Sequence, residues 1–484
     1  MISAEMVSSA LRVQTVNNPE MQESIRKWSD LYRNSASWNS GRIISLCLAS
    51  AISREFSRLV LAESEISAVG DSYVSKQFEK IRPKLPIIVE KACAMGGIII
   101  KPYISNGKIC VDTVLPESFF AVDFSEDTIT SAVFPEQLII RKNCYTRLEY
   151  HQFDPKKKVC IIRNQCYRSG SADSLGSLCS LSEVPSWSGM QEVTVLTNVD
   201  RPLFAYFRMP LANVIDYENP LGISVYESSE ELIHQADAQW ERIIWEFESG
   251  ERAIDATEDI FRYNQNGKPI LPKGRERMFR TYDIQATEKP FIETFSPEIR
   301  DISLFNGLNR IFQRIEFNCG LAYGTLSDPQ TVEKTAEEIR ASKQRSYTQV
   351  SAIQRNLEFT LENLIYIYNY YAGYYGLSRS DAVLSCVWGD SVLEDTDKEF
   401  QRRLQMVNAG ILTKEKFIAR RCFLMWEGKW DDRMKELFLK YDDKFGCEPD
   451  TYEDILYEAI SYDEFCKYIE ESLNQGKEID DVVE

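Results

Sequence analysis

The side chains with the clearest potential for chemistry in this 484-residue sequence are acids, because only His151 and His234 are histidines. Four acids lie between a predicted strand and a predicted helix: Asp390, Glu394, Asp395 and Asp397. Carboxylate oxygens are the ligands that Mg²⁺ prefers, so this cluster is a candidate metal site. Solvated acids near the start of a helix are the more frequent arrangement, and we favour that interpretation.

Four common enzyme and metal-binding motifs are missing from the sequence. It has no G-x-x-x-x-G-K-[ST] loop, no H-E-x-x-H, no G-x-S-x-G and no EF-hand loop. The adjacent pairs Glu230-Glu231 and Glu337-Glu338 make no acid/base dyad, since neighbouring side chains on a helix point in different directions. The twelve cysteines form no C-x-x-C pair, which indicates buried thiols in a reducing compartment. We therefore expect neither an enzyme nor a cofactor.

Charge and length limit the class of protein further. The formal net charge is −18, which argues against a protein that wraps nucleic acid with a basic surface. Residues 427–484 hold nineteen acids and seven bases, so the acidity is concentrated near the C-terminus. The N-terminus resembles no signal peptide and no apolar run reaches about 18 residues, so we expect a soluble, intracellularly made chain of two to four domains.

Helices and then antiparallel strands are predicted for the first two hundred residues, which makes this part α+β. Apolar residues at helical spacing predict helices over 20–35, 41–63, with Ile44 on its apolar face, and 74–95. Gly96-Gly97 ends the third helix, and Asn106-Gly107 between two apolar runs predicts a hairpin. Further strands are predicted over 119–124, 129–141, 145–153, 158–167, 193–199 and 203–209.

Two long helices, at 224–249 and from Pro297 to about Phe317, enclose a small, locally basic insert with strands near Ala253 and Met278. The first helix has an apolar stripe and an acidic face. A glycine-containing loop follows the second helix, and a helix of about forty residues comes next. The strand 382–388 and C-terminal helices end the chain.

The order of these segments resembles the portal proteins of tailed double-stranded DNA bacteriophages, over roughly residues 20–425. The resemblance is carried by five stretches: Ala92–Gly97, Trp245–Ile254, Phe295–Arg300, Ile315–Thr325 and Lys334–Ile339. It implies an α+β, portal-type fold with an α/β wing, two long stem helices, a small α/β clip insert and a helical crown. The implied parts are the wing (1–221), first stem helix (222–249), clip (250–296), second stem helix (297–317), tunnel loop (318–330), long wing helix and closing strand (331–395) and crown (396–484).

The same resemblance implies a ring, usually of twelve copies, at one capsid vertex. Double-stranded DNA would be packaged and later ejected through it without sequence specificity. The implied partners are the large terminase subunit, head-tail connector proteins, and the major capsid and scaffolding proteins, with no membrane. The protein would be made in the host bacterial cytoplasm and reside in the virion.

Site residues follow from the implied parts. The tunnel loop near the DNA would contain Gly320, Tyr323, Gly324, Thr325, Ser327 and Asp328, with Gly320, Gly324 and Ser327 allowing a moving loop. The stem face toward the channel would present Glu230, Asp237, Glu241 and Glu248, because an acidic lining repels phosphates. The clip would dock the terminase and connectors through Lys268, Lys273, Arg275 and Arg277.

Two other functions are weighed against this one. A metal-dependent nucleic-acid enzyme would use the acids near Asp390. A generic helical scaffold would account for the long helices, but it would not need the β-rich first two hundred residues.

Overall fold

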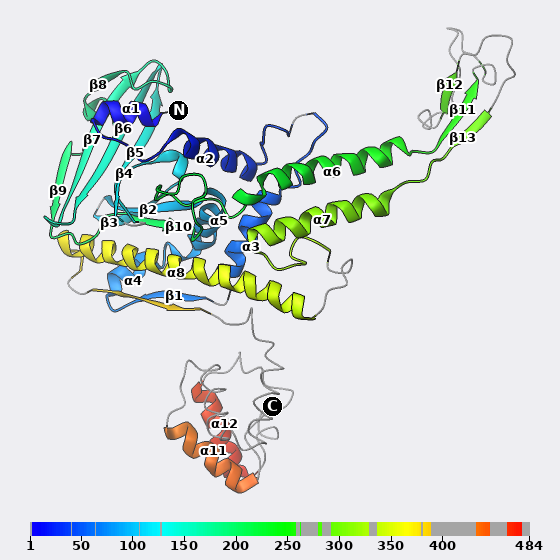
Figure 1. Ribbon diagram of the computed structural model, residues 1–484. Coiled ribbons are helices and arrows are strands. Elements are labelled where there is room, and N and C mark those ends of the chain that lie inside the picture. The colour runs from blue at the N-terminus through cyan, green and yellow to red at the C-terminus, as the bar shows by residue number, and fades with distance from the viewer. Residues whose placement is uncertain are drawn as a thin grey trace. The chain divides into compact units, whose positions relative to one another are not determined.

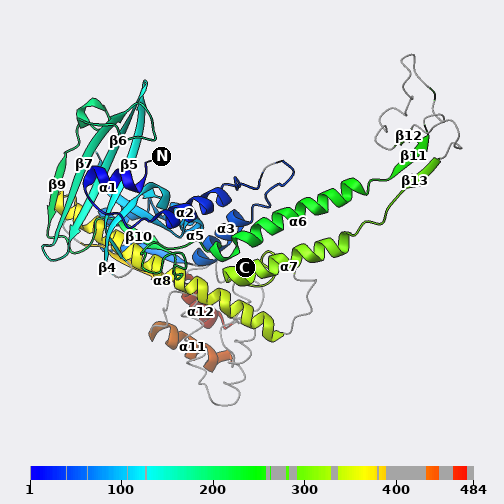
Figure 2. The same cartoon turned by 45° about the horizontal axis from the view of Figure 1, so that its top comes forward.

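The computed structural model divides the chain into two compact units, Met1–Val392 and Leu393–Glu484. In the first unit, helices α6 and α7 lie side by side in both Figure 1 and Figure 2 and connect to a small three-stranded sheet. The structure describes residues 2–39, 41–62, 64–105, 107–125, 128–257, 262, 279–282, 292–328, 336–378, 381–388, 432–445 and 462–476.

Short helices form the start of the first unit: α1 (Ala4–Leu11), α2 (Pro19–Tyr32), α3 (Leu48–Leu61), α4 (Ser72–Phe78) and α5 (Leu85–Met95). The prediction of a helix from residue 41 is wrong, because Cys47 has φ 59° and α3 begins only after it. Ile44, expected on the apolar face, is 69% exposed. The single helix over 74–95 is also wrong: Pro83 and Pro86 lack an N–H, and the chain forms α4 and α5 instead.

The hairpin predicted at Asn106-Gly107 is confirmed. Strands β2 (Gly97–Ser105) and β3 (Lys108–Val114) pair antiparallel, with Ser105 opposite Lys108, and Gly107 has φ 68°. The strand expected over 203–209 is β10 (Ala205–Arg208), which pairs with the other edge of β2. These strands make a three-stranded sheet in the order β10-β2-β3.

A six-stranded antiparallel sheet contains the other strands predicted up to residue 199. Its order is β4 (Phe120–Ser125), β5 (Thr128–Ile140), β6 (Asn143–Asp154), β7 (Val159–Ser169) and β8 (Ser177–Cys179), with β9 (Val193–Thr197) also paired to β7. The short edge strand β8 was not predicted.

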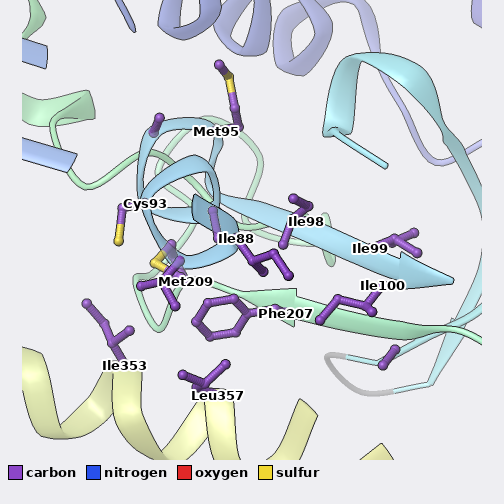
Figure 3. Packing of buried hydrophobic residues seen from close by; sticks show 14 of the residues in the cluster. Ile88, Cys93, Met95, Ile98, Ile99, Ile100, Phe207, Met209, Ile353 and Leu357 are labelled. Carbon is purple, nitrogen blue, oxygen red and sulfur yellow. The ribbon is translucent and has the colours of Figure 1, made fainter. Parts of the chain in front are cut away.

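The main hydrophobic core lies where α5, β2 and β10 meet the long helix α8 (Ala336–Tyr374), as Figure 3 shows. Ile353 and Leu357 of α8 are fully buried near Phe207 of β10. Ile98, Ile99 and Ile100 are consecutive on β2 and all buried, so both faces of this strand are covered. The apolar run of β2 is explained by this two-sided burial.

The two-stranded sheet joins distant parts of the chain. The strand predicted over 382–388 is confirmed as β14 (Val383–Val387), and it pairs antiparallel with β1 (Glu65–Val69). β1 was not predicted, because it is short and its partner lies more than three hundred residues away in the sequence.

The helix pair consists of α6 (Glu230–Ser249) and α7 (Asp301–Cys319). The prediction that the second helix begins at Pro297 is wrong. The backbone N–H of Arg300 donates to the Glu246 carboxylate at 3.2 Å, instead of to a carbonyl of a helix begun at Pro297. Between the helices, β11 (Ala253–Thr257) pairs parallel with β12 (Phe279–Tyr282) and antiparallel with β13 (Ile292–Phe295). β13 was not predicted.

In the second unit the structure describes two helices, α11 (Asp432–Phe445) and α12 (Tyr462–Gln475). Tyr441 of α11 and Ile469 of α12 are buried. Arg433 Nη2 lies 3.0 Å from Glu470 Oε1. The helical character expected of the C-terminal part is thus confirmed for these residues, and the remainder of 396–484 lies outside the described residues.

Replacing Gly96 by alanine should destabilise the protein. Gly96 has φ +80° and ends α5, and an added Cβ would lie 2.3 Å from the Gly222 carbonyl oxygen. We expect Gly96→Ala to lower the free energy of unfolding by about 2–4 kcal/mol in denaturant titrations. The control Gly373→Ala changes a residue of α8 that has open space around it. This substitution should change the free energy of unfolding by less than about 1 kcal/mol. Equal midpoints for the two variants would contradict this interpretation.

Candidate functional site

The helix pair α6/α7 is held together by aromatic and polar contacts along its length. Phe305 of α7 lies 6.4 Å, centroid to centroid, from both Trp240 and Phe247 of α6. Gln239 Nε2 donates to the Leu304 carbonyl at 3.2 Å. The apolar stripe predicted for the first helix therefore faces the second helix in part. Trp245 of α6, however, remains 49% exposed.

An ion pair joins the ends of α6 and α7 next to the small sheet. Glu246 accepts Nε and Nη2 of Arg300 at 3.0 and 2.7 Å, in addition to the backbone N–H. These hydrogen bonds lower the pKa of Glu246 to about 2. Although Glu246 belongs to the acidic face predicted from the sequence, it is buried against α7.

Asp237, predicted to line a channel, does not do so: its side chain is only 1% exposed. Its carboxylate accepts Trp38 Nε1 at 3.0 Å and the Leu46 N–H at 2.8 Å. Asp237 therefore attaches the connection between α2 and α3 to the helix pair. The prediction failed because a buried acid is indistinguishable from a solvated one when its partners lie far away in the sequence.

The other acids of the predicted channel face differ in exposure. Glu248 is exposed and Glu241 is half-buried. Glu230 is also half-buried and lines a cleft of about 670 Å³ together with Glu23, Lys27 and Trp38. Burial, reinforced by the charge of Glu227, raises the pKa of Glu230. Of the four predicted residues, Glu248 is thus the most accessible.

The loop that follows α7, residues 320–328, is organised by the buried carboxylate of Glu316. Oε1 accepts the N–H groups of Gly324, Leu326 and Ser327 at 3.1, 2.6 and 2.8 Å, and Oε2 accepts the Ser327 hydroxyl at 2.8 Å. Glu316 is 0% exposed, and Gly320, the residue that caps the end of α7, has φ +79°. Converging N–H groups of this kind replace the water that a buried anion loses.

Neighbouring helices also hold this loop. The Tyr323 N–H donates to Ser342 Oγ at 2.7 Å, and the Asp328 N–H donates to Asn309 Oδ1 at 2.8 Å. The guanidinium of Arg345 lies 4.3 Å from the centroid of the Phe317 ring.

Ser327, predicted to help a loop move, is buried and bonded twice to Glu316, so in this structure it holds the loop in place. Gly320 and Gly324 both have positive φ values, which glycine adopts without strain. Thr325 is half-buried, and residues 329–330 lie outside the described residues.

Sequence reasoning missed Glu316, although a signal was present. Glu316 follows Phe312 by four residues and Ile315 by one, so it falls on the apolar side of the predicted second helix. An acid at such a position must find donors, and the nearest candidates are the backbone N–H groups of the following loop.

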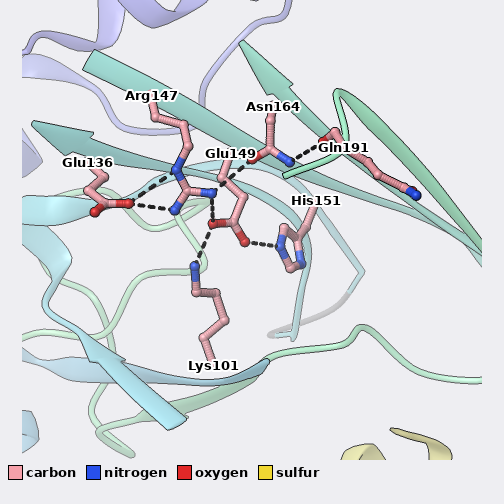
Figure 4. Close-up of polar contacts among 7 residues, drawn as sticks. All are labelled: Lys101, Glu136, Arg147, Glu149, His151, Asn164 and Gln191. Carbon is pink, nitrogen blue, oxygen red and sulfur yellow. Dashed lines mark hydrogen bonds and ion pairs between the residues drawn. The ribbon is translucent and has the colours of Figure 1, made fainter. Parts of the chain in front are cut away.

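A second buried polar cluster, shown in Figure 4, connects two sheets of the first unit. Glu149 of β6 accepts Lys101 Nζ of β2 at 2.9 Å and contacts Arg147 and His151. Burial raises the pKa of Glu149, but the bond from His151 and the charges of Lys101 and Arg147 outweigh it and hold this pKa well below its usual range. Burial lowers the pKa of His151. All four side chains are buried, so the cluster is a structural link between sheets.

The predicted docking and metal residues are not covered by the structure. Lys268, Lys273, Arg275 and Arg277 lie outside the described residues, as do Asp390, Glu394, Asp395 and Asp397. In the described part of the insert, Arg280 Nε donates to Asp255 Oδ1 at 2.7 Å. Among the described residues, no His, Cys, Asp and Glu side chains are grouped as a metal site would require, and no helix is long and apolar enough to span a membrane.

Comparison with known proteins adds a family match. The sequence matches the family model described as phage portal protein, SPP1 Gp6-like, over residues 84–424. A search of curated proteins found no match.

Two solved structures are similar to this chain at low TM-scores. One is the neck of a native GTA particle computed with C12 symmetry, with TM-score 0.42 and 9% identity over 86% of this chain and 97% of that chain. The other is the virion of a native gene transfer agent particle, with TM-score 0.41 and 8% identity over the same shares. We draw no conclusion from similarities this low.

The ion pair between Glu246 and Arg300 predicts a pH-dependent effect. Because the folded-state pKa of Glu246 is about 2 and its unfolded value is near 4.5, the pair stabilises the fold above pH ~5 and is lost as the pH falls toward 2. We expect Arg300→Gln to lower the Tm at pH 7, and the difference from wild type to shrink steadily down to pH 3. A difference that is independent of pH would show that Arg300 acts through packing alone.

Glu316 offers a matched pair of substitutions. Glu316→Ala leaves the N–H groups of Leu326 and Ser327 without this acceptor, whereas the Gly324 N–H keeps its bond to Ser327 Oγ, and the change should cost about 3–5 kcal/mol of unfolding free energy. Glu316→Gln keeps an oxygen that can accept the N–H groups of the loop. It should therefore cost about half as much unfolding free energy, or less. Limited proteolysis should cleave the alanine variant within 320–328 earlier than it cleaves the glutamine variant. Equal sensitivity of both variants would mean that the carboxylate does not organise the loop.

Proposed function

The chain belongs to the family of phage portal proteins, SPP1 Gp6-like, and on this premise we propose that it assembles into a closed ring that conducts double-stranded DNA. The observation that carries the proposal is the helix pair α6/α7. One chain leaves large apolar side chains on both of these helices in contact with water.

The exposed apolar side chains of the helix pair need a partner surface. Ile302 of α7 is 73% exposed, and four others on the two helices are between a third and a half exposed: Ile244, Trp245, Phe247 and Phe305. Ile299, just before α7, is 39% exposed. Large exposed apolar side chains gathered on two paired helices are typical of an interface. Since these residues occur on both helices, one copy can use α6 against α7 of the next. Head-to-tail contacts of this kind make a closed ring when the rotation from copy to copy leads back to the first copy.

We further propose that acids left free by the internal contacts of α6 line the channel. Glu241 and Glu248 are the remaining candidates, because Asp237 is buried and Glu230 faces the cleft. Phosphates contacted by lysine or arginine would be held in place, whereas an acidic lining leaves the duplex mobile. Gly324 and Asp328 are exposed on the loop after α7, which makes them candidates for contact with the DNA.

The ends of the helix pair suggest further roles. The insert between α6 and α7, residues 250–296, would dock the large terminase subunit during packaging and the head-tail connector afterwards.

In this proposal the protein is a structural part of the virion at a capsid vertex, in contact with capsid and scaffolding proteins. A separate ATPase would supply the energy for translocation, in keeping with the missing Walker motif.

A metal-dependent nucleic-acid enzyme is the second candidate function. It rests on the acids Asp390, Glu394, Asp395 and Asp397. No observation on the described residues favours it over the ring.

Charged substitutions on the helix pair should separate assembly from folding. We expect Trp245→Glu and Ile302→Glu to remain monomeric under conditions where the wild type forms rings, with unchanged circular dichroism. The control Ile139→Glu alters a residue that is equally exposed but lies on β5, and it should still form rings.

Native mass spectrometry and electron microscopy measure the outcome directly. Rings from both helix-pair variants would refute this interface. Wild-type protein that stays monomeric even with its capsid and scaffolding partners would refute the ring itself.

A further inference from the structure

Two cysteines lie directly opposite each other at the edge of the six-stranded sheet. In the register of β7 and β8, Cys166 pairs with Cys179, and Arg147 of β6 is opposite Cys166 on its other side. The Cys179 thiol donates to Cys166 Sγ, and the two sulfur atoms are 3.3 Å apart. Both thiols are free.

The backbone positions of this pair suit a covalent bond. Opposed residues of antiparallel strands have Cα atoms about 4.5–5.5 Å apart, which is within the range that disulfides span. The sulfur atoms must approach from 3.3 Å to about 2.05 Å, a change that side-chain rotation supplies. β8 has three residues and pairs on one side only, so it can adjust more readily than a central strand.

We propose that Cys166 and Cys179 form an intrachain disulfide when the folded protein meets a disulfide oxidant such as oxidised glutathione. The site goes beyond the proposed function and does not depend on it. In a reducing cytoplasm both thiols of a ring-forming protein would stay reduced. The protein would meet a disulfide oxidant only on leaving that compartment.

The reaction proceeds by two thiol–disulfide exchanges. Cys179 is half-buried, whereas Cys166 is almost fully buried, so the Cys179 thiolate attacks oxidised glutathione first. This step forms a mixed disulfide and releases one glutathione. The Cys166 thiolate then attacks Cys179 Sγ and expels the second glutathione. Two protein thiols are oxidised, and one oxidised glutathione is reduced to two thiols.

The surroundings of Cys166 set the rate of the second step. Burial raises the pKa of the Cys166 thiol, and so do the contact with Cys179 and the charge of Glu183, while Arg147 lowers it. Since the thiolate is the nucleophile, closure should be slow at neutral pH and faster at alkaline pH.

The bond would fix a small satellite core. Leu181, Val184 and Trp187 follow β8 and are buried together with Cys166. The guanidinium of Arg147 lies 5.8 Å from the centroid of the Trp187 ring. A disulfide closing the span from 166 to 179 would hold this segment on the sheet after local opening.

Peptide mapping of the folded, full-length chain tests the proposal. Trypsin cleaves after Arg163 and Arg168, so Cys166 is the only cysteine of peptide 164–168, and Cys179 lies in the peptide that begins at Ser169. After oxidised glutathione and alkylation, we expect these two peptides to be joined, with the loss of two alkylatable thiols. A reductant should restore both thiols.

Two variants and one control complete the experiment. Cys166→Ser and Cys179→Ser should each abolish the joined peptide, whereas Cys47→Ser, which removes an exposed thiol elsewhere, should retain it. Should a variant misfold, the wild-type map still decides. Wild-type protein in which both thiols remain alkylatable, in which either cysteine joins a different one, or which forms the bond only after denaturation would overturn the proposal.

Discussion

Three carboxylates on the helix pair are removed from water, and the geometry of the surrounding segments follows from how each one is satisfied. Asp237 binds the connection between α2 and α3, Glu246 binds the start of α7, and Glu316 binds the loop after α7. A buried charge without donors costs several kcal/mol, so each segment must bring N–H groups to its carboxylate. Glu246 thereby joins α6 to the start of α7, whereas Asp237 and Glu316 attach the helix pair to the connection between α2 and α3 and to the loop after α7.

These same carboxylates mark the limit of what the sequence could predict. Helices and hairpins arise from local patterns, and the hairpin at Gly107, the helix stop at Gly96 and the pair α6/α7 were all predictable. Proline effects were also local, but the apolar periodicity over 74–95 concealed them. The partners of Asp237 lie about two hundred residues away in the sequence, and the partner strand of β1 lies more than three hundred residues away. A local sequence pattern does not show which distant residues become partners in the fold.

The formal charge of the chain differs from the charge that it exposes to solvent, because some of its acids are buried. Glu246 and Glu316 belong to the interior, whereas Glu248 faces solvent. A count of acids along α6 therefore overstates the charge that the helix presents to its surroundings. The apolar side chains show the opposite pattern: Trp245 and Ile302 look like core residues in the sequence, yet the single chain leaves them in water. The buried acids and the exposed apolar side chains have one explanation. A helical pattern shows which residues are polar, but it does not show which other residues cover them.

The Glu316 contacts have a consequence for how the sequence of this loop can vary. Three of the four donors are backbone N–H groups, which every residue except proline carries. The bonds to Glu316 therefore do not depend on the side chains at 325 and 326, which add contacts of their own: the Thr325 hydroxyl donates to the Ala322 carbonyl, and Leu326 packs against the main core. A mutation there removes only the contact of that side chain, because every replacement except proline keeps the backbone N–H groups that hold the loop on Glu316.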